Sequence, residues 1–272
     1  MKALSISLLL GASLALSATA ASADQLADIK SRGTLVCGTL GTAEPFSFPE
    51  PQTREIQGYD VDFCKALAKS MGVKMELKLI AVAARVPELQ QGRVDVVIAN
   101  LGYTAERAEQ IAFSNQYFAS ETKVAARKES GMTQVKELAG KRVSAVKGSS
   151  SEAGTRRAIP TATTVTFQDP SSAFLAMQQG KVDGFALSEL SLIKFKAQSE
   201  ATVPLVTLEP ALFLEPWGVG MRKDEAALIK QVNTTLDAME KSGEALQLFN
   251  KWMGASTPYK MQRGFKIEPI KG

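Results

Sequence analysis

The segment ARVPELQQGRVDVVIANL at residues 84–101 is nearly repeated as SAFLAMQQGKVDGFALSEL at residues 172–190, and this repeat gives the clearest indication of the fold. Both copies place apolar residues at helical spacing ahead of Gln-Gln-Gly (Val86, Leu89, Phe174 and Met177). A basic residue, Val-Asp and an apolar run follow in each copy. This pattern predicts a helix ended by a glycine at positive φ and then a buried strand. The two copies indicate either one unit used in two lobes or a chance recurrence of common helix-to-strand sequence.

The rest of the chain continues the alternation of strands and helices. Strands are predicted at 34–40, 74–80, 123–127, 141–146, 164–168 and 217–223, and helices at 58–72, 147–158 and 224–254. Such alternation predicts an α/β fold with mostly parallel sheets. No Pro/Gly/Ser-rich linker divides the chain. We therefore expect two lobes joined by strands.

The N-terminus has the features of a secretory signal peptide. Lys2 precedes an apolar run over 4–16, and a small-residue stretch ends at Ala23. The run is too short for a membrane span, so cleavage after Ala23 is predicted, with an uncleaved anchor as the alternative. No cysteine precedes Cys37, so no lipid anchor is expected. The mature protein is expected in the periplasm.

The composition excludes several kinds of active site. The sequence has no histidine and two cysteines, so His-dependent nucleophiles, His-ligated metals and four-cysteine sites are ruled out. A formal net charge of +4, without basic runs, gives no reason to expect a nucleic-acid partner. We expect no catalytic residue, no metal and no cofactor.

The two cysteines, Cys37 and Cys64, fall in a predicted strand and a predicted helix, both at buried positions. An oxidising compartment permits a disulfide between them. Two separate buried thiols are slightly favoured, with the disulfide as the alternative.

Four segments carry a resemblance to a known family. They are GYDVDFCKALAKSMGV (58–73), QQGRVDVVIANLGYTAERAEQIAFSNQYF (90–118), LAGKRVSAVKGSSSE (138–152) and GEALQLFNKWMG (243–254). Together they closely resemble the polar amino-acid solute-binding proteins of ABC importers. The pattern T-x-E-R-x-x-x-I-x-F-S-x-x-Y/F, Thr104 to Phe118 here, is specific for that family. The similarity extends from about residue 33 to residue 254.

The resemblance implies a two-lobed clamshell of the periplasmic-binding-protein type, with a ligand cleft closed by hinge motion. Lobe 1 would comprise 24–119 plus 217–272, and lobe 2 would comprise 120–216. The hinge crossings would lie near Ala119–Ser120 and Pro216–Trp217. The implied partners are an amino acid or related carboxylate and an inner-membrane ABC permease, and a monomer is expected.

The resemblance also indicates how the ligand's α-carboxylate is held. Arg107 would fork onto it, although spacing alone fits a surface arginine paired with Glu106 or Glu109. The backbone at Ala99, Asn100 and Gly102 would face the same end of the ligand.

Across the cleft, Gly148, Ser149 and Ser150 would offer a helix N-terminus to the ligand's α-carboxylate. The same GSSSE sequence is also a helix-capping signature, with Ser149 and Glu152 as the capping pair.

Departures from the family bear on the ligand. Ser188 stands where an aspartate commonly accepts the ligand's α-ammonium, and Leu40 and Ala43 replace a frequent aspartate and a frequent aromatic. Glu44 or Glu189 could substitute as the acceptor, or either could be a solvated surface residue.

Arg85 occupies a position that often reads the ligand side chain, which favours an acidic ligand such as glutamate or aspartate; a solvated first-turn arginine is the alternative. The candidate pocket walls are Phe46, Phe48, Tyr103 and Phe118, and core packing is the alternative for all four.

The leading function is therefore a receptor that delivers an amino acid to a permease. A receptor for a non-amino organic acid is the variant that Ser188 suggests. An arogenate/prephenate-type dehydratase on the same fold would need Glu189 or Glu44 as its general acid. A sensor domain of a signalling receptor is the remaining class.

Overall fold

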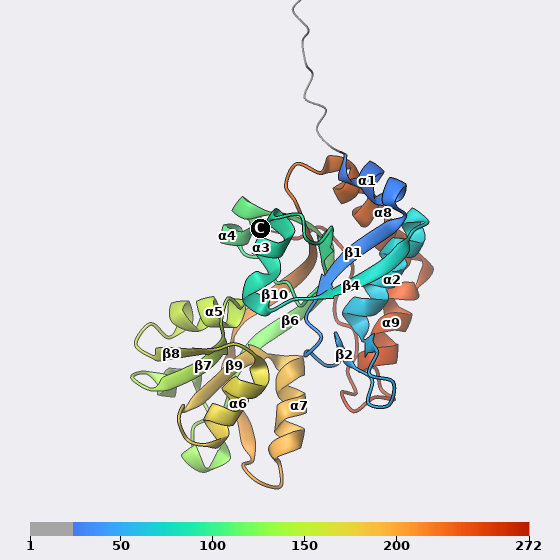
Figure 1. Ribbon diagram of the computed structural model, residues 1–272. Coiled ribbons are helices and arrows are strands. Elements are labelled where there is room, and N and C mark those ends of the chain that lie inside the picture. Colours follow the sequence, from blue (N-terminus) through green and yellow to red (C-terminus); the bar gives the residue numbers. More distant parts are fainter. Residues whose placement is uncertain (1–23, 272) are drawn as a thin grey trace, which may run out of the picture.

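The computed structural model describes residues 24–271, and the predicted signal peptide at 1–23 lies outside them. Figure 1 shows two lobes side by side, one around β1 and β4 and the other around β7 and β8. One sheet runs through both in the order β4-β1-β5-β10-β6-β9-β7-β8. Its strands are β1 (Thr34–Thr39), β4 (Lys74–Leu79), β5 (Val96–Val97), β6 (Ala112–Arg127), β7 (Arg142–Val146), β8 (Thr163–Phe167), β9 (Gly184–Ser188) and β10 (Leu205–Met221).

Helices cover the sheet in both lobes. The first lobe carries α1 (Gln25–Arg32), α2 (Tyr59–Met71), α3 (Arg85–Gln90), α4 (Ala105–Gln110), α8 (Ala226–Ser242), α9 (Glu244–Met253) and the short pair β2 (Phe48–Pro49) and β3 (Ile56–Gln57). The second lobe carries α5 (Ser150–Ala158), α6 (Pro170–Gln178) and α7 (Glu189–Ser199). Within the described residues, no helix has the length and apolar character needed to cross a membrane.

The repeated sequence forms the same unit in each lobe. α3 leads to β5, which pairs parallel with β1, and α6 leads to β9, which pairs parallel with β7. The glycines between helix and strand, Gly92 and Gly180, have φ of +66° and +70°. Glycine adopts this conformation without the steric cost that a Cβ brings. The prediction of one unit used in both lobes is confirmed.

The long strands β6 and β10 join the lobes. They pair antiparallel, with Ala119 opposite Pro216 and Ser120 opposite Glu215. The sequence predicted only their outer ends, at 123–127 and 217–223, so a single continuous sheet was not expected. The predicted hinge crossings fall inside these strands, while the limits assigned to the two lobes remain a prediction.

The two cysteines form a disulfide, which corrects the expectation of separate thiols. α2 packs on β1 and brings the Cα atoms of Cys37 and Cys64 to 6.2 Å. Both residues are fully buried in the core of the first lobe. The two buried positions predicted from the sequence therefore face each other.

Replacing both cysteines by alanine is expected to lower the free energy of unfolding by about 3–4 kcal/mol, because the disulfide closes a loop of sequence separation 27 in the unfolded chain. Urea unfolding of the ligand-free protein measures this change. Wild-type protein unfolded with a reductant should lose a similar amount. A double variant as stable as the oxidised protein would contradict the prediction.

Candidate functional site

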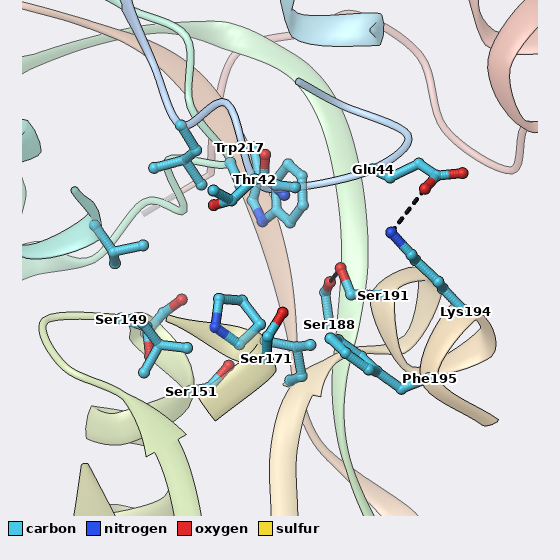
Figure 2. A pocket seen from close by; sticks show the side chains of 18 of the residues that line it. Thr42, Glu44, Ser149, Ser151, Ser171, Ser188, Ser191, Lys194, Phe195 and Trp217 are labelled. Carbon is cyan, nitrogen blue, oxygen red and sulfur yellow. Dashed lines mark hydrogen bonds and ion pairs between the residues drawn. The ribbon is translucent and has the colours of Figure 1, made fainter. Parts of the chain in front are cut away.

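A cleft between the lobes holds about 800 Å3 of space that no protein atom fills, part of it open to solvent. Figure 2 shows Thr42, Glu44 and Trp217 on one side of this space and Ser149, Ser171 and Ser188 on the other. Most of the polar side chains around it are uncharged. They include the six serines Ser149, Ser150, Ser151, Ser171, Ser188 and Ser191, together with Thr42, Asn100 and Gln198.

Asn100 stands at the cleft just after β5, in a left-handed conformation with φ of +50°. Asparagine tolerates this region better than most residues. Its N–H donates to Oδ2 of buried Asp60 at 3.0 Å, and its carbonyl accepts from Arg85 at 2.8 Å. Two buried side chains of opposite charge therefore fix this backbone segment.

Asp60 belongs to the first turn of α2 and is fully buried. Its Oδ1 accepts from the Tyr117 hydroxyl at 2.9 Å. Burial raises the pKa of Asp60 to about 7, while the bonds from Tyr117 and Asn100 and the charge of Arg85 act in the opposite direction. Asp60 thus links α2, β6 and the end of β5.

Arg85 lines the cleft but is bound to the main chain. Its side chain donates to four carbonyls, those of Val82 (2.9 Å), Ala99 (3.0 Å), Asn100 (2.8 Å) and Gly148 (3.3 Å). It is 3% exposed, and burial, followed by the charge of Arg107, lowers its pKa to about 9. The sequence predicted that Arg85 would bind the ligand's side chain, whereas in the structure its guanidinium is bonded to backbone oxygens.

Arg107, in the first turn of α4, is not among the residues that line the cleft, and it connects the lobes through the main chain. Nη1 donates to the Gly102 carbonyl at 2.6 Å, and Nη2 donates to the Gly148 carbonyl at 3.0 Å. A guanidinium has five N–H donors, so others remain for a ligand. Burial lowers the pKa of Arg107, and the nearby carboxylates of Glu215 and Glu106 raise it.

Ser149 and Ser150 line the cleft from the N-terminus of α5. Ser149 Oγ accepts from the Glu152 N–H at 3.1 Å, and Glu152 accepts from the Gly148 N–H at 2.8 Å. The helix-capping interpretation of GSSSE is therefore correct. The same residues also face the cleft, so capping and ligand contact are compatible here.

The candidates for an ammonium acceptor have different surroundings. Ser188 lines the cleft, and its hydroxyl bonds the Ser191 hydroxyl at 2.9 Å. Glu44 also lines it but forms an ion pair with Lys194 of the opposite lobe at 2.7 Å (Figure 2). Glu189 is not among the lining residues and pairs with Lys123 at 3.1 Å. Neither of the two glutamates offers an unpaired carboxylate to the cleft.

Three other predicted residues support the cleft without lining it. Phe46 is fully buried and packs against Tyr59, Phe118 and Trp217, so it belongs to the core rather than to the pocket wall. Ala99 is also fully buried and contributes its carbonyl to Arg85. Gly102 contributes its carbonyl to Arg107.

A family model of the bacterial extracellular solute-binding proteins, family 3, matches residues 35–255. The chain belongs to that family. The glutamine-binding protein GlnH of Bacillus subtilis is 31% identical over 234 residues, covering 85% of each chain. The L-cystine-binding protein TcyJ of Escherichia coli is 29% identical and covers 84% of this chain and 85% of its own.

Solved structures of amino-acid-binding proteins share the fold of this family 3 protein. An ancestral arginine-binding protein bound to glutamine is 32% identical, with a TM-score of 0.76, covering 82% of this chain and 99% of its own. The P235GK mutant of ArgBP from T. maritima is 29% identical, with a TM-score of 0.78, and the match covers 84% of this chain and 98% of the mutant's chain. The expected two-lobed α/β fold is confirmed. The chain is an amino-acid-binding protein of the kind that serves ABC import, and it is not an enzyme.

Several cleft residues of this family 3 protein were missed in the sequence. Glu215 comes from the part of β10 that was not recognised as a strand, Trp217 is the first residue of the predicted strand at 217–223, and Lys194 and Phe195 come from α7. Glu215 is the charged residue among them that is almost fully buried, at 4% exposure. A Glu-Pro-Trp-Gly sequence at the predicted crossing was the available signal.

Proposed function

We propose that the protein is a periplasmic receptor that captures an L-amino acid in the cleft and delivers it to an ABC permease of the inner membrane. The observation that carries this proposal is the convergence of both lobes on Gly148. Arg85 and Arg107 from one lobe donate to its carbonyl, and the Ser149–Ser150 helix start from the other lobe follows it directly. A ligand carboxylate at this point can contact both lobes and stabilise the closed form.

The cleft lining supports a ligand with a polar, uncharged side chain, of the glutamine kind. The charges that line it are balanced: Glu44 is paired with Lys194, and Arg85 is bonded to carbonyls and accompanied by Glu215. GlnH of Bacillus subtilis, by its name, binds glutamine. Among the described residues that line the cleft, both cations already have partners, so neither is left over for an acidic side chain.

Glutamate or aspartate, the ligands expected from the sequence, form the second candidate. Lys194 favours them, because its ammonium lines the cleft and can leave Glu44 to bind a ligand carboxylate. In that case the replacement Lys194→Ala should remove glutamate binding, while glutamine binding should persist.

Thermal unfolding against a ligand panel tests the proposal. The protein is unfolded and refolded to remove bound ligand, and the panel holds the common L-amino acids and several dicarboxylates. A ligand at 100 times its Kd adds about 2.7 kcal/mol, a Tm shift of roughly 5–10 °C for a chain of this size. Glutamine is expected to give the largest shift. A shift with dicarboxylates alone, or with no compound, would refute an amino-acid receptor.

A further inference from the structure

Glu215 stands in the cleft wall near the Ser150 hydroxyl, and within residues 24–271 only one of its two oxygens accepts a hydrogen bond of good geometry. The residue lies within β10, beside the crossing between the lobes, and is 4% exposed. Its Oε2 accepts from Nε1 of Trp217 at 2.8 Å. Its Oε1 is buried and has no hydrogen-bond partner within residues 24–271. A buried acceptor without a donor is costly, and an ionised carboxylate can only accept.

The free oxygen lies directly over Gly102. A Cβ added to Gly102 would stand 1.7 Å from Glu215 Oε1, so the absence of a side chain at 102 makes room for the carboxylate. The carbonyl of the same glycine accepts from Arg107. In an α-amino acid, the carboxylate and the ammonium are attached to one carbon. An ammonium acceptor must therefore lie beside the group that binds the carboxylate, and Glu215 lies beside Arg107's partner Gly102.

The other polar groups of the cleft are weaker candidates for the acceptor of the ligand's ammonium group. The carboxylate of Glu44 is occupied by Lys194, and the Ser188 hydroxyl, which donates to Ser191, is uncharged and therefore a weaker acceptor for an ammonium than a carboxylate. Glu215 makes no ion pair with any residue of the 24–271 range that the structure describes. A second buried acceptor without a partner among these residues, Oδ1 of Asn100, belongs to the same lining. Two unmet acceptors in one cleft call for a ligand group that is rich in donors.

We propose that Glu215 binds the ligand's α-ammonium group, with Asn100 Oδ1 as a further acceptor, in place of the residue expected at Ser188. This assignment rests on the proposed function, because it requires an amino-acid ligand. Burial raises the pKa of Glu215, whereas hydrogen bonding from Ser150 and Trp217 and the positive charges of Arg107 and Arg85 lower it. A bound ammonium acts in the same direction as these four and favours the ionised carboxylate.

The replacement Glu215→Gln tests the assignment, since it keeps the shape and an acceptor for Trp217 but presents an uncharged amide. The matched control is Glu189→Gln, a carboxylate outside the cleft. The probes are L-glutamine and 4-carbamoylbutanoate, which is glutamine without its amino group, titrated by calorimetry. If the panel selects another amino acid, that amino acid and its deaminated acid replace them.

Glu215→Gln is expected to weaken binding of the amino acid 10- to 100-fold and to leave binding of the deaminated acid unchanged or tighter. Glu189→Gln should leave both unchanged. The assignment is overturned if Glu215→Gln binds the amino acid as wild type does, or if it loses both probes equally. A circular dichroism melt of the ligand-free variant separates loss of binding from loss of folding.

The emission of Trp217 provides a second measurement, because its indole donates to the same carboxylate. In a Trp252→Phe background, which removes the other of the two tryptophans, ligand should change this emission. The change should be absent in Glu215→Gln at saturating ligand. An unaltered change in that variant would count against contact at Glu215.

Failure of the proposed function can be distinguished from failure of this assignment. If no amino acid binds the wild-type protein, the proposed function is refuted, and cadaverine, an amine without a carboxylate, then tests Glu215 alone. A cadaverine shift that Glu215→Gln abolishes keeps Glu215 as an ammonium acceptor. The absence of any cadaverine shift in the wild type would overturn that role as well.

Discussion

Replacing Arg107 by alanine is expected to weaken amino-acid binding about 100-fold. The variant loses the guanidinium proposed for the ligand carboxylate and the bridge between the carbonyls of Gly102 and Gly148. Truncating one partner of a buried, hydrogen-bonded charge pair costs about 2–5 kcal/mol, and about 3 kcal/mol corresponds to two orders of magnitude in Kd. Calorimetric titration with the best ligand of the panel measures the change.

A matched control is Arg93→Ala, since Arg93 is exposed and pairs with Glu88 away from the cleft. Its Kd should equal that of the wild type. Arg107→Lys should fall between the wild type and the alanine variant, because an ammonium cannot fork onto a carboxylate. A Kd for Arg107→Ala within threefold of the wild-type value would mean that this arginine serves only to connect the lobes.

Replacing Asp60 by asparagine is expected to remove a pH-dependent destabilisation on the order of a few kcal/mol. Burial first, opposed by the donors Tyr117 and Asn100 and by Arg85, raises the pKa of folded Asp60 to about 7 from the ordinary 3.8. The unfolded carboxyl releases its proton at lower pH than the folded one. The stabilising contribution of Asp60 is therefore complete below pH 4 and is lost as the pH rises to 7.

Urea unfolding at intervals from pH 4 to pH 8 tests this expectation. The difference in unfolding free energy, wild type minus Asp60→Asn, should decline between pH 4 and pH 7 and stay level above that range. Asp28→Asn, at an exposed position of α1, serves as the control and should follow the wild-type curve. A constant difference for Asp60→Asn across the range would contradict the raised pKa.

The sequence contained the parts of the fold that depend on local pattern. The helix at 58–72 is α2, ending at Met71 with Gly72 at φ of +71°. Both Gln-Gln-Gly copies have their predicted turn, because the glycine requirement is local. Most of β6 and most of β10 could not be recognised. Two prolines interrupt the 205–221 segment, and prolines usually argue against a central strand.

The sequence also predicted only part of the candidate site, because some of its contacts form between the two lobes. Ser149, Ser150, Ser188, Glu44, Arg85 and Asn100 do line the cleft. The partners of their side chains could not be predicted from the sequence, because the bond from Arg85 to Gly148 and the ion pair of Glu44 with Lys194 join different lobes. Phe46 was misplaced, since aromatic residues in a loop beside a helix can pack inward as readily as toward a ligand. Glu215 was missed because the part of β10 that contains it was not recognised in the sequence.

The interruption of β-pairing between Trp217 and Gly218 lies two residues from Glu215. In the proposed closure of the lobes, the strand segment that twists would therefore also carry the carboxylate proposed to bind the ligand. Choice of ligand and ease of opening are consequently not independently adjustable in this protein. A substitution that alters recognition at 215–217 will also alter the rates of capture and release, so new specificities should evolve here together with new transport kinetics.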